Sequence, residues 1–245
     1  MIKLLPHKDR WENKTFNWVS GEKEKYESFK TWQAEHELYY KDLEISYSFN
    51  SEGFRAPEFD TIEWGNSWAF VGCSNMMGEG NRLEDTIPYL VEKQINEPCI
   101  NLGSVGYCNT MIFLTALKLL SQVNPKRLVV LWIHNIRSTY YPKKGELLRS
   151  LNKDLEDTFV NDEKKTPINY KSLTGIIEGI EHHCNWRVEI YESILKGLAP
   201  NSIILHYNDF LEVEGLKQAR DRRHPSWKWN THVANEIVKI SKGKL

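Results

Sequence analysis

The chain has 245 residues, with 32 lysines and arginines against 33 aspartates and glutamates, which gives a net charge of −1 at pH 7. This length is enough to bury a core without disulfides, as one large domain or a domain with a subdomain. The balanced charge gives no reason to expect nucleic acid or a membrane surface as a partner.

The sequence carries no pattern typical of export. The first apolar stretch ends at Pro6, too early for a signal peptide, and no run approaches the roughly 20 apolar residues that span a bilayer. We therefore expect a soluble, cytoplasmic protein. Four cysteines form no C-x-x-C pair, and we interpret them as reduced packing residues: Cys73, Cys99, Cys108 and Cys184.

The first 65 residues differ in pattern from the rest. Residues 21–40 are amphipathic and charged, which predicts a surface helix. Residues 42–60 alternate before a glycine and a proline, which predicts a strand or hairpin followed by a turn. We expect residues 1–65 to form an extension packed against a main domain over residues 66–245, where it could cover a sheet edge.

From about residue 66, short apolar runs alternate with helical patterns. The apolar runs predict strands over residues 68–74, 99–106, 127–135 and 201–207. The helical periods predict helices over residues 85–96, 109–123, 181–200 and 229–241, and residues 138–170 are a polar stretch without a predicted element. Such alternation is typical of βαβ units, so we expect a three-layer α/β/α domain with a flavodoxin-like parallel sheet.

Small and polar residues follow three of the predicted strands. The first strand ends at Gly72-Cys73-Ser74, the second between Gly103 and Gly106, and the third at Asn135. Ligands of parallel sheets bind outside the carboxyl ends of the strands. The three strand ends therefore predict a site at one edge of the sheet.

A possible acid–base pair precedes the last helix. Asp221 and His224 stand three residues apart on a short loop, directly before Pro225. The carboxylate could fix the imidazole tautomer, and His224 could take the proton from the Ser74 hydroxyl, which needs such a base to attack. Taken alone, the D-x-x-H pattern is weak, and a capped loop before the last helix is the more common explanation for it.

Taken together, these blocks resemble the SGNH hydrolase superfamily, also known as GDSL-like esterases and lipases, over about residues 66–242. The four family blocks are similar, in order, to Gly72-Cys73-Ser74 with Gly78, to Gly106, to residues 133–136, and to residues 221–224.

The resemblance implies a role for each residue of the site. Ser74 is the nucleophile, and the oxyanion hole is formed by the backbone N–H of Ser74, that of Gly106 and the Asn135 side chain. His224 is the general base and then the general acid, and Asp221 orients it. Each oxyanion donor is typically worth about a hundred- to a thousandfold in rate.

Two blocks depart from the family pattern. Cys73 replaces an aspartate that is mainly a structural neighbour of the serine. Ile133 and Ile136 replace the glycine and aspartate that usually flank Asn135. Asn109, just past the second block, is another amide that could reach the site and bind substrate.

Other features allow more than one interpretation. Cys73 could be a nucleophile, although adjacent residues at a strand end face opposite ways, which favours the serine. Residues 181–184, EHHC, could suggest a metal cluster, but adjacent helical side chains diverge, and we expect no metal and no cofactor. Trp227 could line a substrate pocket or simply pack its loop. Arg82 and Arg137 could hold an anionic group or pair at the surface.

These patterns predict a serine esterase acting on a small-molecule or glycan ester. The resemblance favours removal of O-acetyl groups from carbohydrate as the first hypothesis. The alternative, suggested by the divergent third block, is a non-catalytic SGNH-like module that binds glycan or a partner protein. The two differ in whether the D-x-x-H loop lies near Ser74.

Overall fold

The computed structural model describes Leu4 and residues 12–17, 45–133, 138–140, 149–151, 185–210 and 225–243. The predicted surface helix over residues 21–40 lies outside them.

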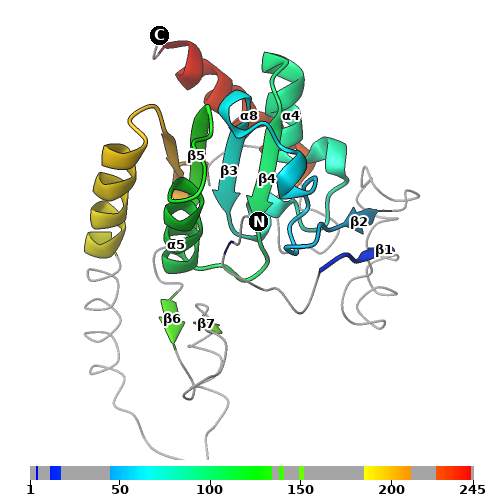
Figure 1. Ribbon diagram of the computed structural model, residues 1–245, viewed down its shortest axis with the longest axis horizontal. Helices are drawn as coiled ribbons and strands as arrows, with labels where there is room; N and C mark the ends of the chain where they lie inside the picture. Colours follow the sequence, from blue (N-terminus) through cyan, green and yellow to red (C-terminus); the bar gives the residue numbers. More distant parts are fainter. Residues whose placement is uncertain are drawn as a thin grey trace, which may run out of the picture.

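A parallel sheet of four strands forms the centre of the molecule (Figure 1). In spatial order the strands are β4 (Cys99–Gly103), β3 (Trp68–Gly72), β5 (Arg127–Trp132) and β8 (Ile203–His206). The first of them in the chain lies between the second and the third, which is the flavodoxin-like order. The predicted three-layer α/β/α fold is confirmed, and its switch point lies at the carboxyl end of β3.

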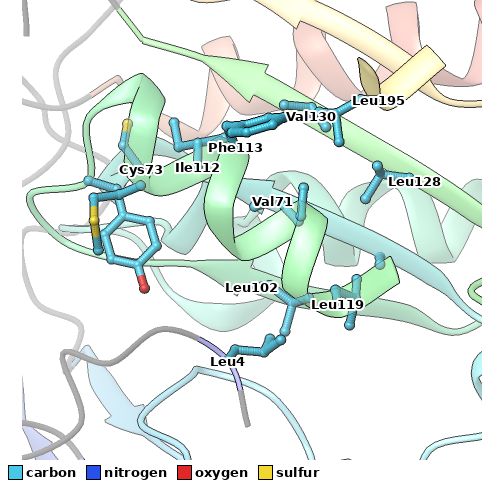
Figure 2. Close-up of a cluster of buried hydrophobic side chains, with 14 of the residues drawn as sticks. Leu4, Val71, Cys73, Leu102, Ile112, Phe113, Leu119, Leu128, Val130 and Leu195 are labelled. Carbon is cyan, nitrogen blue, oxygen red and sulfur yellow. The ribbon is translucent and has the colours of Figure 1, made fainter. Parts of the chain in front are cut away.

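Alternating side chains of the strands build one hydrophobic core on each face of the sheet. On one face, Val71 and Val130 pack with α5 (Asn109–Leu120) and with the helix over residues 185–198 (Figure 2). On the other face, Phe70 packs with α4 (Ile87–Ile95) and α8 (Trp227–Gly243). This alternation is the period-two pattern of a strand buried on both sides.

The central strands end earlier than predicted. β4 stops at Gly103, because Gly106, with φ of +75°, turns the chain away. β5 stops at Trp132, opposite the last paired residue of β8. In contrast, α8 begins at Trp227, two residues before the predicted start.

Shorter elements complete the described structure. β1 (Thr15–Asn17) and β2 (Ser46–Ser48) form an antiparallel pair, as do β6 (Ser138–Tyr140) and β7 (Arg149–Leu151) within the polar stretch where no element was predicted. The short helices are η1 (Phe59–Thr61), η2 (Trp64–Asn66), α3 (Ser74–Met77), η3 (Leu83–Asp85) and η4 (Tyr207–Phe210).

Residues before position 66 contribute directly to the core. Leu4, Phe54 and Trp64 belong to the cluster on the α5 face, and Figure 2 shows Leu4 beside Leu102. Ile45 belongs to a separate small cluster of buried side chains, formed by Ile45, Tyr47, Phe49 and Met77. The described part of the N-terminal region therefore packs on the α/β domain; the boundary at residue 65 remains a prediction. No helix in the described ranges is long and apolar enough to cross a membrane.

Two glycines allow α3 to lie against the strand ends. A Cβ on Gly72 would stand 2.6 Å from the Met76 Cβ. A Cβ on Gly103 would stand 2.7 Å from the Met76 carbonyl carbon and still closer to the Met77 nitrogen. Any larger residue would push α3 off the sheet, because backbone atoms cannot move aside as a side-chain tip can.

Replacing Gly103 should therefore destabilise the fold. We expect Gly103→Ala to lower the free energy of unfolding by about 1–3 kcal/mol or more, as overpacking usually does. Gly197→Ala is the matched control, since a Cβ there meets nothing within 4 Å, and it should be neutral or stabilising by up to about 1 kcal/mol. Urea unfolding of both variants measures the difference, and equal stabilities would contradict the close packing of α3.

Candidate active site

Ser74 begins α3 directly after β3, at the switch point of the sheet. Its carbonyl accepts hydrogen bonds from the N–H groups of Gly78 and Glu79, both at 3.0 Å, so the chain turns back at once. Gly78 has φ of +81°, a left-handed conformation that favours glycine. The Ser74 residue is buried, at 3% exposed.

A buried asparagine fixes the end of α3 against the sheet. The Asn101 side-chain N–H₂ donates to the Met76 carbonyl at 3.1 Å, and its oxygen accepts from the Gly103 N–H at 3.0 Å. Residue 101 lies within β4 and is 4% exposed. The amide therefore connects the Ser74 turn to the neighbouring strand, where it satisfies backbone groups that no ladder pairs.

A buried arginine holds the same turn from the N-terminal region. The Arg55 guanidinium donates to the carbonyls of Gly78 and Asn81, at 3.3 and 3.2 Å, and its carbon lies 4.3 Å from the centre of the Tyr47 ring. The Tyr47 hydroxyl accepts from the Gly80 N–H at 2.7 Å. Arg55 is 4% exposed, so residues 45–58 hold the loop after α3 from the interior.

The predicted second oxyanion donor lies in an open turn after β4. The Gly106 N–H donates to no residue in the part of the chain that the structure describes. A Cβ at position 106 would meet no atom within 4 Å, so open space lies beside this backbone. The next residue, Tyr107, is fully buried and hydrogen-bonds Ser104, and burial raises its pKa to about 12. A fixed turn with an unpaired donor beside open space suits the stabilisation of a developing negative charge.

The Asn109 amide pairs with backbone at the end of β5. Its N–H₂ donates to the Ile133 carbonyl at 3.0 Å, and its oxygen accepts from the Ile133 N–H at 2.9 Å. Asn109 thus fixes the chain two residues before Asn135, which lies outside the described residues. Substrate binding by Asn109 and the oxyanion role of Asn135 both stay predictions.

Asp221 and His224 also lie outside the described residues, but the structure places the residue that follows them. Pro225 is buried, and its carbonyl accepts a hydrogen bond from the Asn81 side chain at 3.2 Å. A second link joins the same two regions, because the Asn230 amide donates to the Asp85 carbonyl at 2.8 Å. The chain next to the D-x-x-H motif therefore contacts the loop that follows Ser74.

Three further residues have visible packing or pairing. Trp227 is half-buried against the cluster that contains Met77, as expected of a packing residue; substrate contact stays a prediction. Cys73 is 1% exposed within the α5-face core (Figure 2), which favours packing over nucleophilic chemistry. Arg82 pairs with Asp85 at 3.0 Å, which favours the pairing interpretation over an anion site.

Arg137 and the EHHC segment over residues 181–184 lie outside the described residues, so an anion site at the first and a metal cluster at the second stay untested. Within the described part of the chain, no group of three or more histidine, cysteine, aspartate or glutamate side chains could hold a metal ion.

Sequence reasoning missed three polar side chains that hold the Ser74 turn and the loop after it: Arg55, Asn81 and Asn101. It also missed Asn230, which joins α8 to the Asp85 carbonyl. Arg55, Asn81 and Asn230 stand in mixed polar segments without a periodic pattern, and the partners named above are backbone groups. The polar residue within the otherwise apolar β4, Asn101, is the only one of these with a local signal.

Comparison with known proteins adds distant structural likenesses. No protein-family model matches the chain, and no curated protein matches it. A solved structure that matches belongs to a proposed lipolytic protein of the G-D-S-L family from Desulfitobacterium hafniense DCB-2. It has a TM-score of 0.41 and 14% identity, and the match covers 71% of this chain and 99% of that chain. The chain's own topology is a parallel sheet in flavodoxin-like order between helical layers, with Ser74 at the switch point.

The buried Tyr107 predicts a loss of stability at alkaline pH. Its pKa of about 12 in the folded protein exceeds the value of about 10 for an unfolded tyrosine. The stabilisation is complete below pH 10 and is lost as the pH rises toward 12, at up to about 1.4 kcal/mol per pH unit. In urea unfolding between pH 8 and 12, wild type should lose more free energy than Tyr107→Phe. Parallel curves for the two proteins would contradict the buried neutral phenol.

Proposed function

We propose that the chain is a serine esterase of the SGNH type, in which Ser74, His224 and Asp221 cleave an acyl ester. The observation that carries this proposal is the contact between the Ser74 turn and Pro225. Two successive links make it: Glu79 donates to the Ser74 carbonyl, and the Asn81 amide bridges the carbonyls of Glu79 and Pro225, each at 3.2 Å. Since adjacent Cα atoms lie about 3.8 Å apart, this contact supports a histidine at position 224 close to the serine.

The reaction follows from the roles of these residues. The Ser74 oxygen attacks the ester carbonyl carbon while His224 takes its proton, and Asp221 stabilises the imidazolium. The negative oxygen is held by N–H donors of Ser74 and Gly106 and by the Asn135 amide. Collapse expels the alcohol, which receives the proton from His224. Water then attacks the acyl-serine in the same way and releases the acid.

The burial of Ser74 suits a small acyl group better than a large one. A serine that is 3% exposed leaves little room for a long acyl chain, whereas an acetyl group is among the smallest that an ester can carry. We propose an O-acetyl group of a carbohydrate as the substrate class and the cytoplasm as the location. The reaction needs no cofactor.

A non-catalytic SGNH-like module that binds glycan or a partner protein is the second candidate. The divergent third block favours it, because Ile133 and Ile136 stand where the SGNH pattern has a glycine and an aspartate beside Asn135. The two candidates differ in one respect, because a binding module keeps its affinity when Ser74 is replaced and turns over no ester.

Hydrolysis of p-nitrophenyl acetate by wild type and Ser74→Ala tests the catalytic proposal. We expect kcat to fall by at least about a thousandfold in the variant, because the residual rate without a nucleophile is small. Cys73→Ala is the matched control and should stay within about threefold of wild type, since Cys73 packs in the core. Equal turnover by wild type and Ser74→Ala would refute the serine mechanism.

The pH profile tests the base. A histidine that must be neutral to accept the serine proton makes kcat/KM rise with pH through about 6.5, unless the site shifts this value. The rise should be absent in His224→Gln. A rate independent of pH from 5 to 9 in wild type would exclude histidine as the base.

A further inference from the structure

We infer that Asn81 is a positioning residue, whose side-chain amide sets the place of His224 relative to Ser74. The inference rests on the proposed function and adds to it a residue outside the four SGNH-like blocks. Asn81 is 1% exposed and lies in the loop between α3 and η3. Its N–H₂ group donates to two carbonyls, those of Glu79 and Pro225, at 3.2 Å each.

The chemistry of this contact requires a primary amide. Two carbonyl oxygens from segments far apart in the chain meet one nitrogen, and only a group with two N–H donors satisfies both. A carboxylate of the same shape would present negative charge to both carbonyls, and a methyl group would remove both hydrogen bonds. Asn81 therefore holds Pro225 specifically.

A shift of Pro225 should also shift His224. The two residues share a peptide bond, and a residue before proline is restricted to extended conformations. Few backbone rotations remain to absorb an error in the place of Pro225. On the other side, the Glu79 N–H binds the Ser74 carbonyl at 3.0 Å, so the same loop carries both halves of the predicted pair. A misplacement of about 1 Å in such a pair can cost about a hundredfold in rate.

The surroundings of Asn81 make it a fixed reference point. The Arg55 guanidinium donates to the Asn81 carbonyl at 3.2 Å, and the Asn81 backbone N–H donates to the Gly78 carbonyl at 3.1 Å. The link between Asn230 and Asp85 joins the same regions at a point farther along α8. Removal of the Asn81 amide should thus displace Pro225 locally while the second link keeps α8 attached.

Three variants separate positioning from general stability. Asn81→Ala removes both donors, and Asn81→Asp replaces them with acceptors in nearly the same volume. Asn230→Ala is the matched control, because Asn230 is equally buried, at 1% exposed, and joins the same regions away from His224. All are assayed well below their measured melting temperatures, so that every sample is folded.

The measurement is the rate at which diisopropyl fluorophosphate labels Ser74, together with kcat and KM for p-nitrophenyl acetate. We expect both Asn81 variants to label and turn over about ten- to a hundredfold more slowly, with KM within about twofold. Asn230→Ala should stay within about threefold in rate. Equal losses in Asn81→Ala and Asn230→Ala, or wild-type rates in both Asn81 variants, would overturn the positioning role.

If one Asn81 variant does not fold, the other decides the outcome. The failure of the proposed function has a different signature, because then wild type itself is not labelled and Ser74→Ala leaves ester turnover unchanged. Labelling of wild type that Ser74→Ala abolishes, with unaltered rates in the Asn81 variants, would refute only the inference about Asn81.

Discussion

The candidate site depends on buried side-chain amides that pair with backbone at points where regular structure ends. A strand or helix that stops in the interior leaves N–H and C=O groups that must still find partners. Asn101 supplies them for α3, Asn109 for the end of β5, and Asn81 for the segment that begins at Pro225. An amide suits this task because it donates and accepts in one plane and carries no charge that burial would penalise.

Two glycines allow α3 to come close enough for the Asn101 amide to bond to it. Because Gly72 and Gly103 have no Cβ, α3 lies against two strand ends, and the carbonyls of Met76 and Met77 come within reach of Asn101. The hydrogen bonds of Asn101 to α3 therefore depend on the close packing of α3 against the two glycines. The small residues at the end of β3 have a structural reason as well as the chemical one that Ser74 suggests.

Much of this fold could be predicted from sequence, because buried parallel strands are short, continuous apolar runs. Their ends could not, since the backbone just past β5 pairs with the Asn109 side chain, 24 residues earlier in the chain. Ser74 and Gly106 follow directly from strand ends and family blocks. Asn81 could not be foreseen, because a lone asparagine in a polar loop has no periodicity, and its partner lies 144 residues away. Likewise, nothing in the sequence near Arg55 indicates that three backbone carbonyls of a distant loop surround its guanidinium.

The burial of Arg55 makes residues 45–58 a structural part of the α/β domain. The Asn50 side-chain oxygen accepts hydrogen bonds from the N–H groups of Glu52 and Phe54 and so shapes the turn that carries Arg55. This turn orients the arginine toward the loop after α3. Regions joined through a desolvated cation tend to open together rather than one at a time. Residues 45–58 and the loop after α3 should therefore form one cooperative unit in hydrogen exchange. In that sense residues 45–65 are an integral part of the α/β domain rather than an appendage to it.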